Sequence, residues 1–327
     1  MTTCIQQSKY QKVATATLFP RAPFHFDGTF NKPSRFPSRL LKWSPGTLHQ
    51  TVRLRDQIYG VVINDEGRLD KPALEVSVYH NASVGLDIIG QLLNELSCRY
   101  ALDENLAPFC AKVERDRRFG RTLARWRGVR SSSPYSLYEL LVIALVLQNT
   151  IAKRSVTMLD ALLVRFGTPI TFDGCSLDAI WAPEQLDEVS EDEIRGLKIG
   201  YRARSLKRFS AQFSRQEISE GELRTLGEDD LRRRLLAIYG VGPETARILM
   251  TEVFHRRGAF GHISPWQQKL YPRLLFRRKL ASADSILDFL TDRFGEHREL
   301  ALHYLWEDLF WRHRAAPIDW LERELRL

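Results

Sequence analysis

From about residue 50, hydrophobic and polar residues alternate in short stretches, and this is the period of a β-strand. The runs 51–54, 59–63 and 74–79 alternate in this way and are rich in β-branched and aromatic residues, so we expect antiparallel strands there. In residues 85–101, apolar residues instead recur every three or four positions, which predicts a helix with one buried side. Strands followed by such a helix predict a small α+β unit.

After residue 105 the apolar spacing is helical along most of the chain. We expect one or two helices over 134–166, short helices near 176–182, 191–196 and 201–215, a longer one from about 229, and a last strong one over about 297–312. A chain of 327 residues is too long for one ordinary domain, so two compact units are expected. The expected organisation is a loose N-terminal arm over 1–22, an α+β domain with a small antiparallel sheet over 23–105, and a mostly α-helical domain over 106–327.

Composition narrows the class of protein. A hydrophobic fraction of 44% and a charged fraction of 27% are those of a globular chain, and they exclude a disordered or collagen-like one. No run reaches about eighteen consecutive apolar residues, so no membrane span is expected. The N-terminus has no basic run followed by an apolar core, so we expect a protein of the cytoplasm or nucleoid, or of the nucleus in a eukaryote.

The cysteines argue against a metal centre. No two of them have CxxC spacing and none lies beyond Cys175, so neither a zinc ribbon nor a four-cysteine iron–sulfur cluster is expected. In a reducing compartment they are most simply free thiols. The four residues are Cys4, Cys98, Cys110 and Cys175.

Positive charge is concentrated in one part of the chain. The segment 231–280 has eleven basic residues and two acidic ones, so it accounts for the whole net charge of +8. A second basic stretch covers 112–130. Such segregation favours a polyanionic partner, with nucleic acid as the first choice, over a set of solvated helix faces.

The basic segment contains two apolar helices joined by a glycine turn, over residues 235–250. Gly240 suits the left-handed backbone at the end of the first helix, and Pro243 suits the start of the second. The unpaired N–H groups of such a turn form an anion site, so we interpret it as a helix-hairpin-helix that grips a DNA phosphate, in preference to an ordinary connection. The residues expected to contact DNA here are Gly240, Val241, Gly242, Thr245 and Arg247.

Two further motifs accompany the hairpin. Residues 147–153 (Leu-Gln-Asn-Thr-Ile-Ala-Lys) and 200–204 (Gly-Tyr-Arg-Ala-Arg) resemble segments of the helix-hairpin-helix DNA glycosylases. The resemblance is greatest to the alkyladenine (AlkA-type) and 8-oxoguanine branches, which carry an extra α+β domain. It covers about 23–312 and is strongest over 134–275. The lack of late cysteines separates the chain from the endonuclease III and adenine-mismatch branches.

The resemblance implies an activity and roles for single residues. Members of the superfamily flip a nucleotide out of DNA and cleave the bond between base and deoxyribose. Gln148 stands where the family inserts a polar side chain into the gap left by the flipped base, with Asn149 beside it. Arg202 and Arg204 are implied to contact DNA, and Tyr201 to lie near the base.

The chain departs from the family at the residues that carry its chemistry. The family's aspartate, some twenty residues after the hairpin, corresponds to Ser264, and a neutral serine cannot supply its negative charge. In the same alignment Lys269 and Arg273 take basic positions of the motif and are implied to contact DNA. The lysine that bifunctional members use corresponds to Glu244, which cannot form a Schiff base, so lyase chemistry through this position is excluded.

Three interpretations remain open. In the first, Glu244 acts as general base or charge stabiliser and His262 positions water, although these two could equally be a helix N-terminal acid and an ordinary loop histidine. In the second, the base is itself a good leaving group and Ser264 orients water. In the third, the chain is a catalytically silent reader or a DNA-bending protein.

Of these, we favour a monofunctional glycosylase. Because both key pocket residues are exchanged, we expect an unusual or hypermodified base as its substrate. Trp266 and Tyr201 are expected to stack on the base and Gln267 to bond its edge, with plain packing as the alternative. The expected partner is double-stranded DNA, bound by a monomer with no membrane. We expect no cofactor, although the hairpin turn could hold a monovalent cation.

Overall fold

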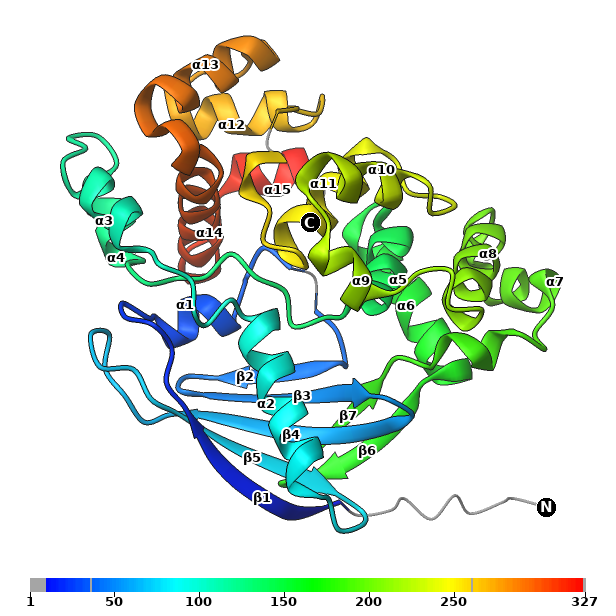
Figure 1. The fold of residues 1–327 in the computed structure, drawn as a ribbon. Coiled ribbons are helices and arrows are strands. Elements are labelled where there is room, and N and C mark those ends of the chain that lie inside the picture. Colours follow the sequence, from blue (N-terminus) through cyan, green and yellow to red (C-terminus); the bar gives the residue numbers. More distant parts are fainter. Residues whose placement is uncertain (1–9, 36, 260, 326–327) are drawn as a thin grey trace.

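The computed structural model describes residues 10–35, 37–259 and 261–325, and it has a sheet-containing unit beside a helical unit (Figure 1). A five-stranded antiparallel sheet has the order β1-β5-β4-β3-β2, and α2 crosses one of its faces. The strands and helices expected in the first hundred residues are therefore confirmed. This part of the chain also contains β1, α1 and β2, which were not expected. The bounds of its elements are β1 (Gln11–Leu18), α1 (Phe26–Phe30), β2 (Leu41–Ser44), β3 (Thr47–Leu54), β4 (Gln57–Asp65), β5 (Leu74–His80) and α2 (Leu86–Arg99).

Both faces of the sheet are covered. Alternate residues such as Val61 and Val76 pack with Leu92 and Leu96 of α2, because side chains on a strand alternate between the two faces. The opposite residues pack against a two-stranded hairpin from the helical unit. Burial on both sides explains why β4 is an almost unbroken apolar run.

The N-terminal arm is a correction to the expected organisation. Residues 11–18 form β1, which pairs antiparallel with β5 at the edge of the sheet, and only residues 1–9 lie outside the described part of this segment. The strand reads Gln-Lys-Val-Ala-Thr-Ala-Thr-Leu, and its side chains are exposed or half-buried throughout. An edge strand with few large apolar residues gives a weak periodic signal, which is why the pattern did not predict it.

The helix expected near 176–182 is also wrong. This segment belongs to an antiparallel hairpin of β6 (Thr168–Phe172) and β7 (Cys175–Ala179). Asp173 and Gly174 both have positive φ, at 48° and 67°, as a tight two-residue hairpin turn requires. The Phe172 ring lies against β4 so closely that a Cβ on Gly60 would be 2.6 Å from it.

The remaining chain is helical, and the other expected helices are found within a few residues of their predicted positions. The α-helices are α3 (Ala107–Glu114), α4 (Gly120–Arg125), α5 (Leu137–Leu147), α6 (Ala152–Phe166), α7 (Glu191–Ile194), α8 (Arg202–Ser214), α9 (Glu220–Thr225), α10 (Glu228–Leu236), α11 (Pro243–Glu252), α12 (Gln267–Phe276), α13 (Ala283–Phe294), α14 (Arg298–Ala315) and α15 (Asp319–Leu325). Short helical turns are η1 (Pro183–Leu186), η2 (Arg195–Ile199), η3 (Arg257–Ala259) and η4 (Gly295–His297).

Helix α5 is the centre of the helical unit. It is apolar on all sides, and α6, α8 and α11 pack around it. Its start is fixed by a capping box in which the Ser136 N–H donates to the Glu139 carboxylate (2.7 Å) and the Glu139 N–H donates to the Ser136 hydroxyl. A buried, well-capped α5 gives the loop that follows it a rigid base.

None of the helices in the described part of the chain combines the length and apolar character needed to cross a bilayer. Cys98, Cys110 and Cys175 are free thiols, and Cys4 lies outside the described residues.

A buried histidine makes the fold sensitive to acid. His255, just after α11, donates from Nε2 to the Cys98 carbonyl (2.7 Å), and its Nδ1 is buried without a partner among the described residues. Burial lowers the pKa of His255 to about 4, and Arg257 adds to this effect. The unfolded chain therefore binds a proton first as the pH falls below about 6.5, and the stability contributed by neutral His255 is lost towards pH 4.

We expect the His255→Asn variant to lose stability less steeply than the wild type between pH 6.5 and 4. Asparagine tolerates the positive φ of 55° at this position and does not titrate. Melting temperatures measured across this range test the assignment. Parallel curves for the two proteins would show that another group dominates acid lability.

Candidate functional site

The glycine turn between α10 and α11 is built to leave backbone N–H groups open. Gly240 has φ +86°, and a Cβ there would be 3.0 Å from Ser205, so both conformation and space favour glycine. Gly242 is the N-cap of α11, and no side chain caps this helix. The start of α11 therefore presents donors and the positive end of its dipole to an anion.

The loop after α5 rests on this turn. The Gln148 side-chain amide donates to the Gly240 carbonyl (3.1 Å), and the Asn149 amide donates to the Tyr201 hydroxyl (3.2 Å). Asn149 has φ +49°, a conformation that asparagine tolerates better than most residues. Three segments far apart in the sequence, around 148, 201 and 240, therefore meet at one place.

Arg202 has a different place from the one implied by the resemblance. It is buried, and its guanidinium donates to the backbone carbonyls of Leu145 (3.1 Å), Ile199 (3.4 Å) and Gln148. It also lies over the Tyr201 ring, 4.7 Å from the centroid. Arg202 therefore holds the loop and the tyrosine in position and does not point outward to a ligand.

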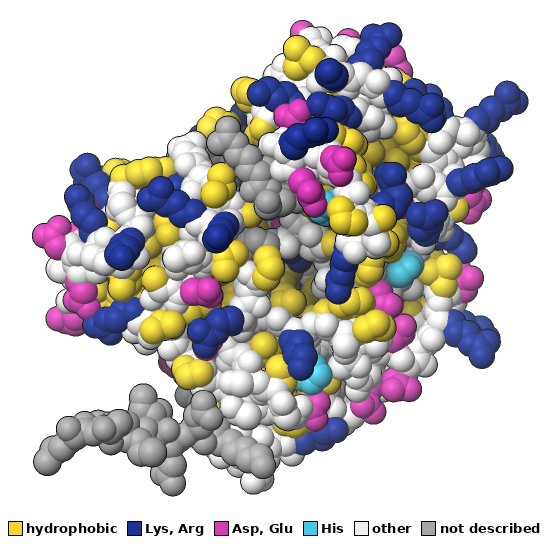
Figure 2. Space-filling model, turned by 180° about the vertical axis from the view of Figure 1, so that it is seen from behind, with side chains coloured by type: hydrophobic (Ala, Val, Ile, Leu, Met, Phe, Trp, Pro, Cys, Tyr) yellow, Lys and Arg dark blue, Asp and Glu magenta, His cyan; other side chains and the backbone are white. Residues whose placement is uncertain are grey.

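Exposed apolar side chains gather on the same segments. Five of the ten exposed large hydrophobic residues that the structure describes lie at the end of α5, at the turn before α8 and on the hairpin; they are Leu147, Ile151, Tyr201, Leu236 and Tyr239. The guanidinium groups of Arg204 and Arg208 lie 6.0 and 4.3 Å from the Tyr239 ring centroid. Basic and hydrophobic side chains also intermingle over the face in Figure 2. Aromatic rings mixed with arginines suit a nucleic acid, which offers both base faces and phosphates.

Helices α11 and α14 together carry a group of three charged residues. We call it the shared-arginine cluster, and it consists of Glu244 and Arg247 of α11 and Glu299 of α14. The Arg247 guanidinium donates to both Glu244 oxygens, from Nε (3.1 Å) and Nη2 (2.9 Å). Its Nη1 lies 3.6 Å from Glu299 Oε1, which also accepts the Thr251 hydroxyl (2.7 Å). Glu244 is half-buried, whereas Glu299 is only 5% exposed.

The pKa values in this cluster are shifted by burial and charge. Burial alone would lower the pKa of Arg247, but the hydrogen bonds and charge of Glu244 outweigh it and raise that pKa. Burial raises the pKa of Glu299, and Thr251 and Arg247 only partly oppose the shift. Arg247 therefore stays charged, while Glu299 gains a proton more easily than an exposed glutamate.

Ser264 and Gln267 are buried and bonded to each other. The Ser264 N–H and hydroxyl both donate to the Gln267 side-chain oxygen (2.8 Å each), and the Gln267 amide donates to the Tyr271 hydroxyl (2.9 Å). The structure therefore differs from the expectation that Gln267 faces a base, because both ends of its amide are used inside the protein. The Ser264 oxygen keeps capacity to accept one more hydrogen bond.

The other residues expected to contact DNA or the base lie at separate places around Ser264 and Gln267. Trp266 is 45% exposed and lies edge-on to Trp306, with 6.0 Å between ring centroids. His262 and Lys269 are exposed. Arg273 was expected to contact DNA, but its guanidinium donates to Glu324 of α15 (2.8 Å) and lies 5.3 Å from the Trp320 ring centroid.

The sequence pattern missed Glu299, Thr251 and Tyr271. A signal was present for the first of these, since Glu299, His303 and Glu307 recur every four residues on α14 and are buried or half-buried. Polar residues at this spacing share one side of a helix. Such a polar stripe on an otherwise buried helix indicates internal partners.

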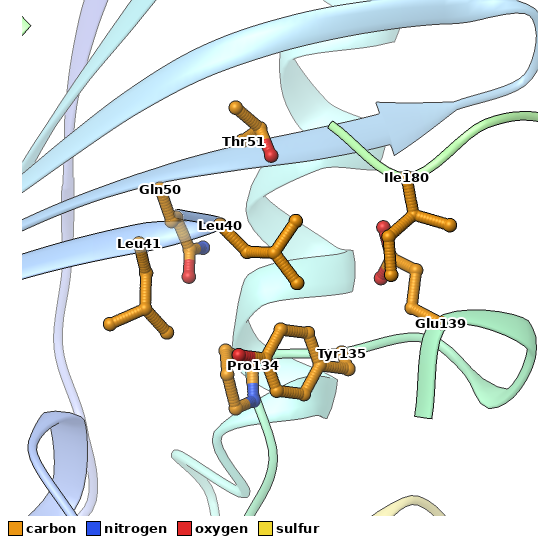
Figure 3. A pocket seen from close by; sticks show the side chains of 8 residues that line it. All are labelled: Leu40, Leu41, Gln50, Thr51, Pro134, Tyr135, Glu139 and Ile180. Carbon is orange, nitrogen blue, oxygen red and sulfur yellow. The ribbon is translucent and has the colours of Figure 1, made fainter. Parts of the chain in front are cut away.

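A small pocket lies elsewhere, between the sheet and the start of α5 (Figure 3). It lies between Gln50 of β3 and Tyr135, and its volume of about 10 Å³ has room for one water. The Gln50 amide nitrogen has no partner among the described residues and could donate to such a water. The cavity is too small for a nucleobase and belongs to the packing between the two units.

Within residues 10–35, 37–259 and 261–325, no three side chains of His, Cys, Asp or Glu are grouped so that they could hold a metal ion. The monovalent cation at the hairpin turn stays a prediction.

The turn allows a clean test of close backbone approach. Gly242 has φ −94°, and a Cβ there would meet nothing within 4 Å. We therefore expect Gly242→Ala to leave the melting temperature unchanged but to weaken duplex DNA binding by about ten- to hundredfold, as when hydrogen bonds to a charged group are weakened. Fluorescence anisotropy at fixed salt measures the affinity.

Gly227→Ala is the matched control, because Gly227 caps the start of α10 and also has open space around it. It should change neither melting temperature nor affinity. Unchanged DNA affinity in Gly242→Ala would show that the hairpin turn is not part of the binding surface.

Comparison with solved structures identifies the architecture. The chain superposes on the 3-methyladenine DNA glycosylase from Archaeoglobus fulgidus with a TM-score of 0.73 at 16% identity, covering 93% of this chain and 99% of that one. It matches MBOgg1, solved with a low-affinity DNA ligand, with a TM-score of 0.67 at 19% identity, covering 94% and 99%. It matches the 8-oxoguanine glycosylase/lyase from Clostridium acetobutylicum with a TM-score of 0.66 at 18% identity, covering 91% and 98%.

No family model matches the sequence, and no curated protein matches it. The likeness therefore lies in the fold, which this chain shares with these solved structures.

Proposed function

We propose that this chain, which has the helix-hairpin-helix glycosylase fold, is a monofunctional DNA glycosylase. In this proposal it flips a modified base out of double-stranded DNA and hydrolyses the bond between base and sugar. The observation that supports this most directly is that the loop with Gln148 and Asn149 joins Tyr201 to the hairpin turn, from which α11 with Glu244 and Arg247 begins. Solved proteins of the same fold carry DNA, among them MBOgg1 and the Clostridium acetobutylicum enzyme.

Binding follows from the uncapped start of α11. A DNA phosphate accepts hydrogen bonds from the open N–H groups of the turn, and Arg204 and Arg208 add positive charge beside Tyr239. This contact carries no sequence information. The exposed apolar side chains next to Gln148 contact the bases at the place where the DNA duplex is opened.

Catalysis follows from the negative charge behind the turn. As the bond to the base breaks, its electron pair leaves with the base, and positive charge develops on the deoxyribose ring. The Glu244 carboxylate stabilises this charge and orients the water that attacks the sugar carbon. The water gives up one proton and the departing base takes one, so the products are a free base and an abasic site.

The residues at positions 264 and 244, which differ from those of the family, also bear on the substrate. Ser264 is neutral and is bonded to Gln267, so the site offers less charge next to the sugar than an aspartate would. A base that leaves easily, or one held by extra contacts, compensates for this. We therefore infer an unusual or hypermodified base, stacked on the exposed Trp266.

A silent reader is the second candidate function, and one observation favours it. Arg247 binds both oxygens of Glu244, which offsets the charge of that carboxylate. A protein of this kind would bind and open DNA without cleaving the bond between base and sugar. It would act as a monomer in the cytoplasm or nucleoid, or in the nucleus of a eukaryote.

Base release separates the two candidates. Duplexes with alkylated, oxidised, deaminated and hypermodified bases are incubated with the wild-type protein, and abasic sites are scored by alkali cleavage. Release from a hypermodified duplex is the expected result, and release from simple alkylated DNA alone would overturn the substrate proposal. Tight binding to one modified duplex without release would favour the reader, and no DNA binding at moderate salt would exclude both.

A further inference from the structure

Glu299 is a buried carboxylate with one oxygen that lacks a hydrogen-bond partner among the described residues, as is Glu307 on the same helix, but only Glu299 lies beside Arg247. Its Oε1 accepts the Thr251 hydroxyl and lies 3.6 Å from Arg247, but its Oε2 is buried with no hydrogen-bond partner in the described part of the chain. A buried charge lacking full hydrogen bonding costs stability. Such an arrangement calls for an explanation other than support of the fold.

Asp308, on the same helix, shows what a structural carboxylate has. One of its oxygens accepts from Arg125 (3.0 Å) and Trp126 (2.9 Å), and the other accepts from Arg312 (2.7 Å). Both oxygens are therefore satisfied. Glu299 differs from Asp308 in lacking this second set of donors.

The charges around Arg247 do not cancel. Glu244 takes two of the guanidinium N–H groups and neutralises that arginine, so an ionised Glu299 gives the shared-arginine cluster a net charge of −1. Arg257 and Arg298 also lie near Glu299. Arg257 is neutralised by Glu104 through two hydrogen bonds of 2.8 Å, whereas Arg298 adds a positive charge beside the three residues of the cluster. The negative charge of the cluster therefore depends on Glu299 as much as on Glu244.

We propose, on the basis of the proposed function, that Glu299 is a positioning residue that acts through Arg247. It holds Arg247 from the side opposite Glu244 and supplies the negative charge that a cationic sugar meets at the site. The charge missing at Ser264 is thus provided from α14. A base-free site of this kind binds a positively charged sugar ring more tightly than a neutral one.

The pH dependence of this preference follows from the groups that face Glu299. These are Arg247 and Thr251 from α11, Arg257 from η3, Tyr271 from α12, and Arg298 on its own helix. Because burial raises the pKa of Glu299, its charge is lost at a higher pH than that of an exposed glutamate. The preference for a cation should therefore decline as the pH falls towards the acid range.

Two abasic duplexes test the proposal without requiring catalysis. One carries a tetrahydrofuran ring, which is neutral, and the other a pyrrolidine ring, whose nitrogen is protonated at neutral pH. We expect the wild type to bind the pyrrolidine duplex at least about tenfold more tightly, as one extra negative charge at the site predicts. The ratio should fall close to one in Glu299→Gln and be partly kept in Glu299→Asp.

Asp308→Asn is the matched control, since it removes a buried, paired carboxylate from the same helix. It should lower the melting temperature and keep the cation preference. Equal affinity of the wild type for the two duplexes would overturn the proposal, and so would a preference that survives in Glu299→Gln. If that variant does not fold, a wild-type preference that stays constant as the pH falls would overturn it instead.

Failure of the proposed function looks different. A protein that releases no base but prefers the pyrrolidine duplex, and loses this preference in Glu299→Gln, would refute the glycosylase and support the role of Glu299. Base release without a cation preference would do the reverse.

Discussion

Replacing Glu244 with glutamine is expected to slow base release by about 10²- to 10³-fold, the loss typical of removing one group that stabilises charge in a transition state. Glutamine keeps the size of the side chain and can still bond Arg247 through its oxygen, so the hairpin keeps its shape. Duplex affinity should change by no more than about threefold, because the phosphate is held by backbone N–H groups. Single-turnover release and anisotropy measure the two effects separately.

Ser264→Ala serves as the comparison for Glu244→Gln. The Ser264 hydroxyl already donates to Gln267, so its removal should reduce release much less than loss of the carboxylate does. Release that survives in Glu244→Gln would point to a base that leaves without help from this residue. It would contradict the role assigned to Glu244.

Replacing Arg99 with alanine is expected to destabilise the protein by about 3–5 kcal/mol, because it leaves buried charges without a partner. Arg99 bonds Glu95 (2.6 Å), Glu139 (3.1 Å) and the Pro134 carbonyl (2.7 Å), and so ties α2 to the start of α5. Chemical unfolding measures the change. A loss below about 1 kcal/mol, the range of a surface pair, would contradict this role.

Arg195→Ala is the control for Arg99→Ala. Arg195 pairs with Glu191 at the surface, so its removal should cost less than about 1 kcal/mol. The pH dependence gives a second check. Burial opposes the charge of Glu95, but Arg99 outweighs it and holds the pKa of Glu95 below its ordinary value. Stability from this pair is present at neutral pH and lost as the pH falls through the folded-state pKa of Glu95.

Local patterns predicted the parts of the fold that local chemistry determines. The glycine turn at 240–242 was recognisable because its conformation restricts the residues that fit, and the helices around it follow from apolar spacing. Strand β1 was missed because it has few large apolar residues, and the β6–β7 hairpin because each of its strands is only five residues long. Both are stabilised by contacts with distant parts of the sheet. Short elements of this kind depend on tertiary context.

The site was predicted only where one motif determined it. Gln148, Asn149 and Tyr201 were found from their motifs, and the structure places them together with Gly240. Arg202 and Gln267 were expected to face a ligand, but their donors are used inside the protein. Whether a polar side chain points inward depends on the backbone groups near it in space. Glu299 illustrates the same limit, because it joins Arg247 across 52 positions of the sequence.

In the proposed function, the hydrogen bond between Gln148 and Gly240 has a consequence for how a target base is found in DNA. While the amide is held on the turn, the same side chain cannot fill a gap in the base stack. Moving it costs about 0.5–1.5 kcal/mol, the net value of one hydrogen bond. At an intact base pair no new contact offsets that cost. In the proposed function the Gln148 side chain therefore stays bonded to Gly240, and the protein slides along the duplex. At a weakened base pair, the gap in the stack offers hydrogen-bond partners to Gln148. The side chain then leaves Gly240 and enters the gap, and the protein stops sliding there.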